Sequence, residues 1–328
     1  MFQEELLAEL KASKDYISGQ ELCEKFGVSR TAVWKAIQKL KNGGYLIQSV
    51  QNKGYKLVDD TDVLNETEIR ERLHTKWAGQ NLVYKDVTAS TNIDAKELGE
   101  QGAVNGTLVV ADKQTAGRGR RGHSWDTMGG TTIAMSLLCR PKVDLGRASM
   151  LTLVMGLALA EAIEDVCGQE TKIKWPNDTV IHGKKVTGTL TEMSAEMDLI
   201  HYVVIGTGIN VNTPPEDFAE EIRDMAGSLK TECGHACSRA ETIAKTMDYF
   251  EKYYEIFEKT EDLSGLKEAY EAKLVNQNAQ VRVLDPKGEY EGIARGIDEL
   301  GNLLVETEGG IQKVYAGEVS VRGLYGYT

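Results

Sequence analysis

A three-residue turn, His182-Gly183-Lys184, limits the fold of this chain more than any other feature of its sequence. The turn lies between two runs of strand-forming residues, and so short a connection joins antiparallel neighbours, because parallel strands need a crossover of a dozen or more residues. Similar runs recur at residues 82–87, 107–111, 132–139, 172–175, 179–182, 185–192 and 201–206. Helical patterns lie at residues 93–100, 151–166 and 240–260. We therefore expect a mixed, mostly antiparallel sheet with helices on one side, rather than a doubly wound parallel sheet.

The composition is that of an ordinary soluble globular protein, with 41% hydrophobic and 27% charged residues. At 328 residues the chain has room for two or three domains. The most apolar stretch, residues 150–163, is too short to span a bilayer and contains Glu161. We therefore expect no membrane partner and a cytoplasmic protein.

Charge is distributed unevenly along the chain. The net charge of −12, taken alone, argues against nucleic-acid binding. Between Lys11 and Lys56, however, nine Lys and Arg residues occur with only three carboxylates, a local net charge of +6. The acidic residues concentrate elsewhere, above all in residues 216–271. This asymmetry indicates a small basic module joined to a larger acidic one.

The basic module has the pattern of a winged helix-turn-helix. Ser18 is a suitable N-cap for one helix, Gly27 permits a tight turn, and Ser29 is a suitable N-cap for a second helix. The apolar stripe of the second helix consists of Val33, Ile37 and Leu40. Two short runs then flank residues 51–54 as in a β-hairpin. A helix-turn-helix at about residues 19–38, followed by a hairpin wing, predicts DNA binding with the second helix in the major groove.

The residues expected to contact DNA face away from the apolar stripe or lie in the wing; they are Arg30, Thr31, Lys35 and Lys53. The alternative is a small helical protein-interaction domain whose charged face is merely solvated. The helix spacing together with the local positive charge favours DNA.

Two segments in the middle of the chain carry groups suited to a polar or anionic ligand. The run Ser90-Thr91-Asn92 precedes a helix, where its side chains either cap the helix or hydrogen-bond a ligand. Residues 117–122 read GRGRRG; the glycines let backbone N–H groups approach an anion, and the arginines offer bidentate contacts to phosphate. Trp125, three residues later, is suited to stacking on a purine base.

Two further segments add polar groups near strand ends. The run KWPNDTVIHGKKVTG places Asn177 and Asp178 across the tight turn from Lys185. The run GTGINVN combines two glycines, which permit close approach to the backbone, with Asn210. The sequence contains no Walker A motif and no Ser-His-Asp or Cys-His nucleophile pattern. We therefore expect positioning and charge stabilisation at phosphate, without a covalent enzyme intermediate.

We expect no metal bound by protein side chains alone. The five cysteines are odd in number and widely spread, which argues against a disulfide framework. The run Cys233-Gly-His-Ala-Cys237 contains three metal-binding side-chain types but lacks a second ligand pair at zinc-like spacing. It is interpreted as a loop with reduced thiols.

Taken in order, STN, GRGRRG with its following tryptophan, KWPND followed by KVTG, and GTGINVN strongly resemble the catalytic domain of biotin–protein ligases. With the winged helix in front, the chain is similar end to end to the ligases that also repress the biotin operon. The resemblance implies a class II synthetase-like catalytic sheet. It also implies a two-step reaction, in which biotin and Mg-ATP give biotinyl-5′-AMP and pyrophosphate, and the adenylate then acylates a lysine of the biotin carboxyl carrier domain of a biotin-dependent carboxylase. Repression would occur at operator DNA as a homodimer, with biotinyl-5′-AMP as corepressor.

The resemblance also assigns roles to single residues. The catalytic cations would be Lys185, Arg118 and Arg120, which offset the repulsion between a carboxylate and the α-phosphate together with Mg²⁺. Biotin would be held by Ser90, Thr91, Asn92, Gln114, Arg118, Gly119, Arg120 and Lys185. The nucleotide would be bound by Trp125, Asn177, Asp178, Asn210 and Arg322.

The end of the chain predicts a separate small domain. From Val281 onward short strand-like runs alternate with turns at residues 285–288 and 300–302, which is typical of a small β-barrel. The resemblance implies that this barrel is SH3-like. We thus expect a winged helix-turn-helix domain at residues 1–65, a catalytic domain at residues 66–275 and an SH3-like β-barrel at residues 276–328.

Three other functions stay open at this level. The first is a repressor that only senses its ligand, and the second is an acyl-adenylate enzyme for lipoate or another short acid. The third is an RNA-binding protein that acts through its arginine–glycine segment. The intact Lys185 and arginine loop argue against pure sensing, and GRGRRG favours biotin. Six residues without repetition give little support to RNA binding.

Overall fold

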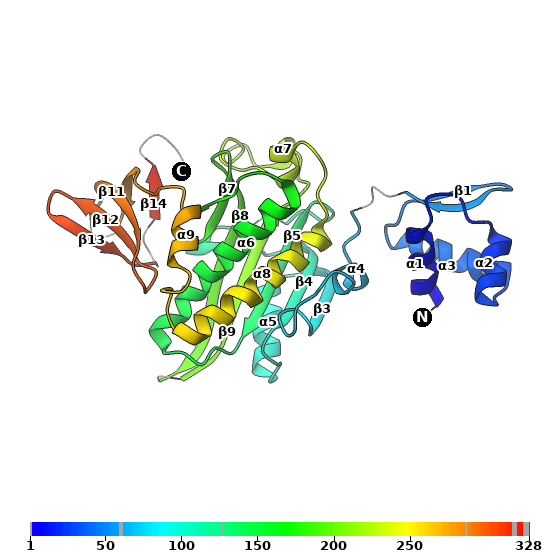
Figure 1. Cartoon of the computed structure of the whole chain (residues 1–328), viewed down its shortest axis with the longest axis horizontal. Helices are drawn as coiled ribbons and strands as arrows, with labels where there is room; N and C mark the ends of the chain where they lie inside the picture. Colours follow the sequence, from blue (N-terminus) through cyan, green and yellow to red (C-terminus); the bar gives the residue numbers. More distant parts are fainter. Residues whose placement is uncertain are drawn as a thin grey trace. The chain divides into compact units, whose positions relative to one another are not determined.

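A computed structural model of the chain describes residues 2–58, 62–125, 127–197, 199–285, 288–316, 320–323 and 328. The chain divides into two compact units, Met1–Val63 and Leu64–Thr328, each with its own hydrophobic core (Figure 1). Among the described residues, no helix is both long and apolar enough to cross a membrane.

The first unit is a helix-turn-helix followed by a hairpin, as the sequence predicts. Its elements are α1 (Phe2–Ala12), α2 (Gly19–Phe26), α3 (Arg30–Asn42), β1 (Ile47–Val50) and β2 (Gly54–Leu57), with the two strands antiparallel. Ser18 Oγ accepts a hydrogen bond from the Glu21 amide and so caps α2. Gly27 ends α2 with a φ of 64°, a conformation that glycine adopts without strain. Ser29 caps α3 in the same way as Ser18 caps α2.

Helix α3 buries one face and exposes the other. The expected stripe Val33, Ile37 and Leu40 lies in the core of the first unit. The four residues predicted to contact DNA, namely Arg30, Thr31, Lys35 and Lys53, are all exposed. Trp34 also lies on the exposed side, where 53% of its surface remains accessible, and the sequence analysis did not single it out.

The second unit is built on a seven-stranded sheet with strand order β3-β4-β5-β9-β8-β7-β6. Its strands are β3 (Leu82–Thr88), β4 (Thr107–Gln114), β5 (Thr132–Cys139), β6 (Lys172–Lys174), β7 (Asp178–Ile181), β8 (Lys184–Glu196) and β9 (Leu199–Asn210). In the pairings of the described residues, β3 and β4 are parallel and the other neighbours are antiparallel. The predicted mixed, mostly antiparallel sheet is therefore confirmed, including the tight β7–β8 turn.

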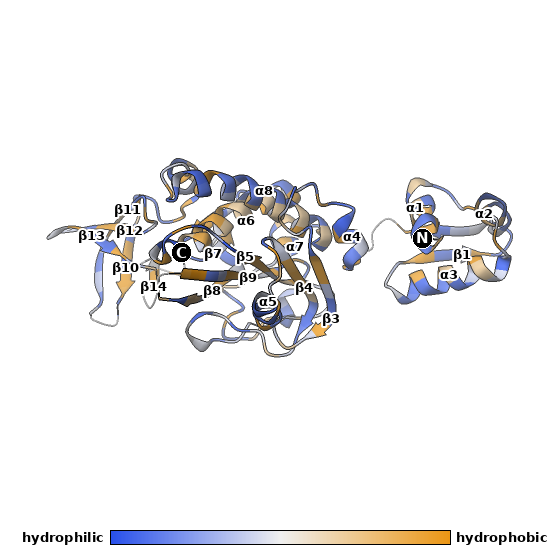
Figure 2. Ribbon diagram, turned by 90° about the horizontal axis from the view of Figure 1, so that it is seen from below, coloured by the Kyte–Doolittle hydropathy of each residue, from blue (hydrophilic) through white to orange (hydrophobic). Residues whose placement is uncertain are grey.

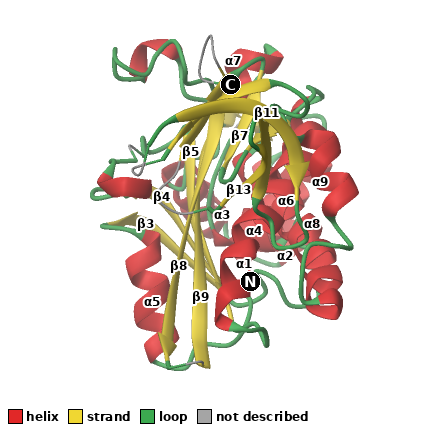
Figure 3. Cartoon of the chain, turned by 90° about the vertical axis from the view of Figure 1, so that its left-hand side faces the viewer, coloured by secondary structure: helices red, strands yellow, loops and turns green. Residues whose placement is uncertain are grey.

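Helices cover both faces of this sheet, so the expectation of helices on one side was wrong. Helices α6 (Leu151–Cys167) and α8 (Arg239–Thr260) lie on one face, and α5 (Thr91–Glu100) lies on the other (Figure 3). The physical reason is visible in β4. Leu108 belongs to the main core, whereas its neighbour Val109 packs with Ala95 of α5. A strand that is apolar on both faces must be covered on both.

Helix α6 is buried around most of its circumference. It packs against the sheet, against α8, and against the short helices α7 (Leu229–Cys233) and α9 (Lys267–Lys273). Its sequence is correspondingly apolar on nearly every side, as Figure 2 shows for α6 and the central strands. A helix without a continuous polar face is stable only in such an environment.

The end of the chain forms a five-stranded antiparallel sheet with strand order β13-β12-β11-β10-β14. Its strands are β10 (Gln280–Leu284), β11 (Tyr290–Ile297), β12 (Leu303–Thr307), β13 (Gly310–Val314) and β14 (Ser320–Gly323). Trp175 Nε1 donates a 3.0 Å hydrogen bond to the Gly301 carbonyl and so ties this sheet to the region of β6. No pairing between β13 and β14 closes a barrel within the part of the chain that the structure describes. The antiparallel sheet is confirmed, and the barrel is not.

The carboxylate of Glu251 on α8 anchors the segment before β3. It accepts hydrogen bonds from the backbone N–H groups of Lys76, Trp77 and Ala78 at distances of 2.8–3.0 Å, and Glu251 is buried.

Glu251→Ala leaves these donors without their acceptor, so we expect it to lower the free energy of unfolding in urea by about 3 kcal/mol. The control is Glu255→Ala, one turn further along α8, whose exposed carboxylate lies 3.8 Å from Lys76 Nζ. This change should cost at most about 0.5 kcal/mol. Equal losses in the two variants would contradict the anchoring role.

Candidate active site

A buried polar cluster surrounds the N-terminus of α5. The hydroxyl of Ser90 makes no capping hydrogen bond, so the side chains at this end are not used simply to cap the helix. Gln114 Oε1 on β4 instead accepts hydrogen bonds from the amide and the hydroxyl of Thr91, at 2.8 and 3.1 Å. Ser136 Oγ on β5 lies 2.7 Å from Thr91 Oγ1 and 2.6 Å from Asn92 Oδ1. Four of the residues predicted to hold biotin are thus brought together.

The cluster contains two residues that the sequence analysis missed. Ser136 is a hydroxyl in the middle of a strand whose eight residues are all buried, and a buried polar group of this kind normally has a specific partner. Glu192 lies on β8 and accepts a 2.7 Å hydrogen bond from Asn92 Nδ2. Glu192 shares a strand face with Gly188 and Leu190, so the period of two was a signal that would have located it.

The charge of Glu192 is stabilised by its neighbours. Burial alone would raise the pKa of this carboxyl group, but hydrogen bonds from Lys96 and Asn92, together with the positive charges of Lys96 and Arg118, hold its pKa below the usual range. Arg118 itself is exposed and pairs with Ser124 in an isolated β-bridge across the glycine–arginine loop. The positive charge of Arg118 therefore stabilises the negative charge of Glu192 in the polar cluster.

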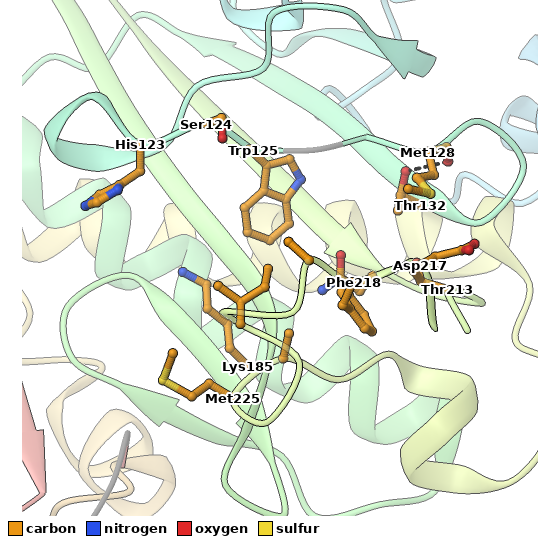
Figure 4. Close-up of a pocket in the computed structure, with 14 residues that line it drawn as sticks. His123, Ser124, Trp125, Met128, Thr132, Lys185, Thr213, Asp217, Phe218 and Met225 are labelled. Carbon is orange, nitrogen blue, oxygen red and sulfur yellow. Dashed lines mark hydrogen bonds between the residues drawn. The ribbon is translucent and has the colours of Figure 1, made fainter. Parts of the chain in front are cut away.

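A cavity of about 370 Å³ lies beside the polar cluster, a volume typical of a small-molecule site. Trp125 and Lys185 reach it from opposite sides, as Figure 4 shows. Asn210 at the end of β9 also lines the cavity, and its Nδ2 donates a hydrogen bond to the Gly227 carbonyl. The remaining lining residues are mostly apolar or hydroxylic and come largely from residues 213–226; they include Thr213, Phe218, Ile222, Met225 and Ala226. No motif or periodicity predicted a role for this irregular segment.

A chain of polar contacts links the glycine–arginine loop to the β6–β7 turn and to the first residues of β7 and β8. Arg120 Nη1 donates a 2.7 Å hydrogen bond to Asn177 Oδ1. Asn177 Nδ2 donates to Asp178 Oδ1 at 3.0 Å, and Lys185 Nζ lies 2.7 Å from the same Asp178 oxygen. Lys185 Nζ also lies 5.6 Å from the centroid of the Trp125 ring. Four predicted site residues from two distant parts of the sequence, Arg120 and residues 177–185, thus form one connected unit.

Strand β8 connects this unit to the polar cluster. Asn177 Nδ2 also contacts the Thr189 carbonyl at 3.2 Å, and Asn92 Nδ2 contacts the carbonyl of the next residue, Leu190, at 3.4 Å. A second cavity of about 180 Å³ is lined by Arg120, Asn177 and Glu192, among others. The predicted biotin end and the predicted nucleotide end are therefore neighbours along one strand.

Three glycines of the predicted motifs are required by this packing. A Cβ atom at Gly206 would lie 2.0 Å from Asn92 Oδ1, and one at Gly208 would lie 2.2 Å from the indole of Trp125. A Cβ atom at Gly188 would lie 2.9 Å from the same indole. The predicted close approach to the backbone is thus made here by side chains of the site.

Gly119 and Arg322 are the predicted site residues that remain to be described. The Gly119 amide donates to the His123 carbonyl at 2.7 Å and so closes the loop on itself. The side chain of Arg322, on β14, lies outside the described residues, so its predicted contact with the nucleotide stays a prediction.

The indole nitrogen of Trp125 is buried and has no hydrogen-bond partner among the described residues. Buried indole N–H groups normally have a partner, so this donor is available to a ligand in the cavity.

The fold and the site define a protein ligase of the biotin/lipoate class joined to a helix-turn-helix. The model of the Biotin/lipoate A/B protein ligase family matches residues 84–210, an HTH domain model matches residues 3–56, and the biotin protein ligase C terminal domain matches residues 278–322. The chain is 43% identical to the bifunctional ligase/repressor BirA of Bacillus subtilis (strain 168) over 95% of each chain. It is 32% identical to the protein of the same name from Escherichia coli (strain K12) over 96% of each. The chain belongs to the BirA family of bifunctional ligase/repressors.

A solved structure agrees with this assignment. The biotin protein ligase from Aquifex aeolicus, in complex with biotin and ATP, superposes with a TM-score of 0.66 at 33% identity. The match covers 74% of this chain and 99% of that chain.

Gly208→Ala tests the packing that holds Trp125. The new methyl group would lie 2.2 Å from the indole, so Trp125 must move out of the cavity wall. We expect ATP affinity, measured by calorimetry, to fall at least about tenfold, or 1.4 kcal/mol. The matched control is Gly156→Ala inside α6, where the nearest atom, Ile173 Cγ2, is at an ordinary 3.8 Å. The two variants should differ; equal ATP affinities would show that Trp125 does not form part of the nucleotide site.

Proposed function

We propose that the second unit forms biotinyl-5′-AMP from biotin and ATP and transfers biotin to a lysine of a biotin carboxyl carrier domain, while the first unit represses biotin-synthesis genes. In the first step a carboxylate oxygen of biotin attacks the α-phosphorus of ATP, and the bond to pyrophosphate breaks. In the second step the lysine amine attacks the acyl carbon, and AMP leaves. The names of the relatives, which combine ligase and repressor, support both halves of this proposal.

One arrangement supports ligation above all. The cations Lys185 and Arg120 flank Asn177 and Asp178 between a buried polar cluster and a cavity walled by an indole. A carboxylate and a phosphate repel each other as they approach, so a ligase must place positive charge where they meet. Lys185, Arg120 and the nearby Arg118 supply that charge.

The polar cluster is suited to the biotin end. Biotin presents a ureido group, which both donates and accepts hydrogen bonds, on a largely apolar body. Hydroxyl and amide groups of both kinds are offered by the buried Ser90, Thr91 and Asn92 and by the partly buried Gln114. Gly119, Arg118 and Arg120 would cover the carboxylate. The neighbouring cavity would take the adenosine, with Trp125 against the base and Asn177, Asp178, Asn210 and Arg322 toward the nucleotide.

Water must be kept from the mixed anhydride, because this group hydrolyses readily. Two segments border the cavity, the loop that carries His123 and Trp125 and the segment of residues 213–226. Their closing over the ligand would both exclude water and strengthen the electrostatic interactions inside.

The residues present fit an ATP-bound magnesium ion. Mg²⁺ is commonly held by one or two carboxylates together with substrate phosphates, and Asp178 supplies such a carboxylate, which accepts a hydrogen bond from the amide nitrogen of Asn177. When bound, the ion would neutralise phosphate charge. Asp178 also holds Lys185 in place by their 2.7 Å contact, so its proposed role does not depend on the metal alone.

Repression would use the first unit. A helix-turn-helix with exposed Arg30, Thr31 and Lys35 and a wing carrying Lys53 is suited to operator DNA. We take biotinyl-5′-AMP as corepressor and a homodimer in the cytoplasm as the DNA-binding form, since a palindromic operator matches a two-fold protein. The domain boundaries proposed are residues 1–65, 66–275 and 276–328. The last would be an SH3-like barrel and the second a class II synthetase-like sheet.

Lys185→Ala should nearly abolish adenylate formation, because it removes the ammonium group beside the reacting phosphate. The measurement is pyrophosphate release with biotin and ATP, followed by mass spectrometry of a carrier domain. The control is Lys184→Ala, the preceding residue, whose ammonium lies 3.7 Å from Glu232 and not at Asp178. Unchanged pyrophosphate release by Lys185→Ala would refute the role of this residue. Pyrophosphate release with lipoate, but not with biotin, by the unmodified chain would instead identify a related acyl-adenylate enzyme.

Lys35→Ala should weaken DNA binding without affecting ligation, because Lys35 lies in the separate first unit. The probe is a duplex selected from a random pool by the unmodified chain with biotinyl-5′-AMP present. If Lys35 contacts a phosphate, the slope of log affinity against log salt should fall by about 1. Lys25→Ala on α2 is the matched control, since Lys25 pairs with Glu9 and is not on α3. Identical salt slopes for the two variants would count against the DNA-binding face assigned to α3.

A further inference from the structure

Three side chains that can bind a metal ion lie close together between the last residue of α7 and the first residue of α8. The sulfur atoms of Cys233 and Cys237 and a ring nitrogen of His235 all lie within 4.8 Å of one another. The two sulfur atoms are 3.6 Å apart, and neither cysteine forms a disulfide with another described residue. We expected reduced thiols without metal here, because the sequence shows no second ligand pair at zinc-like spacing. The folded structure, however, brings three ligands together from five residues.

The sulfur separation matches a shared metal ion better than a disulfide. Two sulfurs bonded tetrahedrally to zinc at 2.3 Å lie about 3.8 Å apart. A disulfide would need them to approach to about 2.05 Å. The observed 3.6 Å therefore needs little adjustment for a metal and a large one for a covalent bond.

Burial around the cluster favours a metal with an open position. Cys237 is buried, Cys233 is partly buried and His235 is exposed. An ion entering from the solvent side would meet three ligands and keep water as the fourth. Two thiolates and one imidazole are a typical donor set for zinc. We propose that Cys233, His235 and Cys237 form a zinc-binding site, distinct from the ligase site and outside its reaction.

The position of the cluster gives this site a structural consequence. Asn212, two residues after the end of β9, holds Cys237 through two hydrogen bonds, from Asn212 Nδ2 to the Cys237 carbonyl and from the Cys237 amide to Asn212 Oδ1. At the other end of α7, Ser228 Oγ donates to the Thr213 carbonyl. Residues 213–226, which line the large cavity, thus leave and return to the body of the protein beside α7. A zinc ion would cross-link the end of α7 to the residues before α8 and hold the base of this segment.

Cobalt and zinc binding test the site directly. The full-length chain is stripped of metal with a chelator under reducing conditions and titrated with Co²⁺, then with Zn²⁺. We expect about one equivalent of each per chain. The Co²⁺ form should show a thiolate-to-cobalt charge-transfer band that Zn²⁺ abolishes. Cys233→Ser and Cys237→Ser should each weaken or remove this band, whereas Cys23→Ser, a change in the first unit, should leave it intact. His235→Ala should keep the thiolate band and weaken the affinity for Co²⁺ and Zn²⁺ by about 10–100-fold.

A second measurement uses only the unmodified chain, so a variant that fails to fold does not leave the question open. Zn²⁺ should protect Cys233 and Cys237, located by mass spectrometry, from alkylation, and it should slow amide hydrogen exchange in residues 213–228. The proposal is overturned if no charge-transfer band forms, if both cysteines alkylate equally fast with and without Zn²⁺, or if they form a disulfide in the presence of reductant. These readouts do not involve ligation, so they stand whatever the outcome of the Lys185 experiment.

Discussion

The contact between Arg120 and Asn177 is the interaction on which the site depends. It joins a glycine-rich loop, none of whose described side chains is buried, to the turn between β6 and β7, at a distance of 2.7 Å. From Asn177 the contacts continue through Asp178 to Lys185. A cation that is partly withdrawn from water needs a compensating anion, and Asp178 provides it before any substrate arrives. Under the proposed function, phosphate oxygens would replace Asp178 as the partner of Lys185 when the nucleotide binds, so the positive charge would stay in position without being left uncompensated.

The same arrangement requires that the sheet have no side chains where the site residues lie. Gly188 and Gly208 face each other across β8 and β9 and make room for the indole of Trp125, and Gly206 makes room for Asn92. Any Cβ atom at Gly206 or Gly208 would overlap a side chain of the site by more than 1 Å relative to ordinary contact distances. The short motifs of the sequence therefore pack against one another. Some supply the polar or aromatic side chain, and the glycine motifs supply the strand surface without side chains on which it lies.

Most of the fold follows from local patterns in the sequence. Capping residues such as Ser18 and Ser29 locate the helices of the first unit, and the turn at residues 182–184 decides the antiparallel pairing of β7 and β8. The face of the sheet that α5 covers could not be predicted from such local patterns, because an amphipathic helix can pack on either face of a sheet. In the structure α5 covers the second apolar face of β4. Ser136 and Glu192 escaped notice for a related reason. The strand period predicts which face each side chain occupies, but not its partner, which is Asn92 in both cases and comes from a distant part of the sequence.

The glycine–arginine loop and residues 213–226 have a further property in common under the proposed function. Both border the cavity, and both are irregular segments whose positions rest on a small number of polar contacts rather than on a core. A ligand shifts a conformational equilibrium only as far as its affinities for the two states differ. An adenylate that contacts both segments binds their closed arrangement more tightly than either substrate alone, because it presents the biotin moiety and the phosphate in one molecule. The intermediate of the reaction is therefore better suited than ATP or biotin to report the supply of biotin to a repressor, and the charges that assist the chemistry also decide which ligand is sensed.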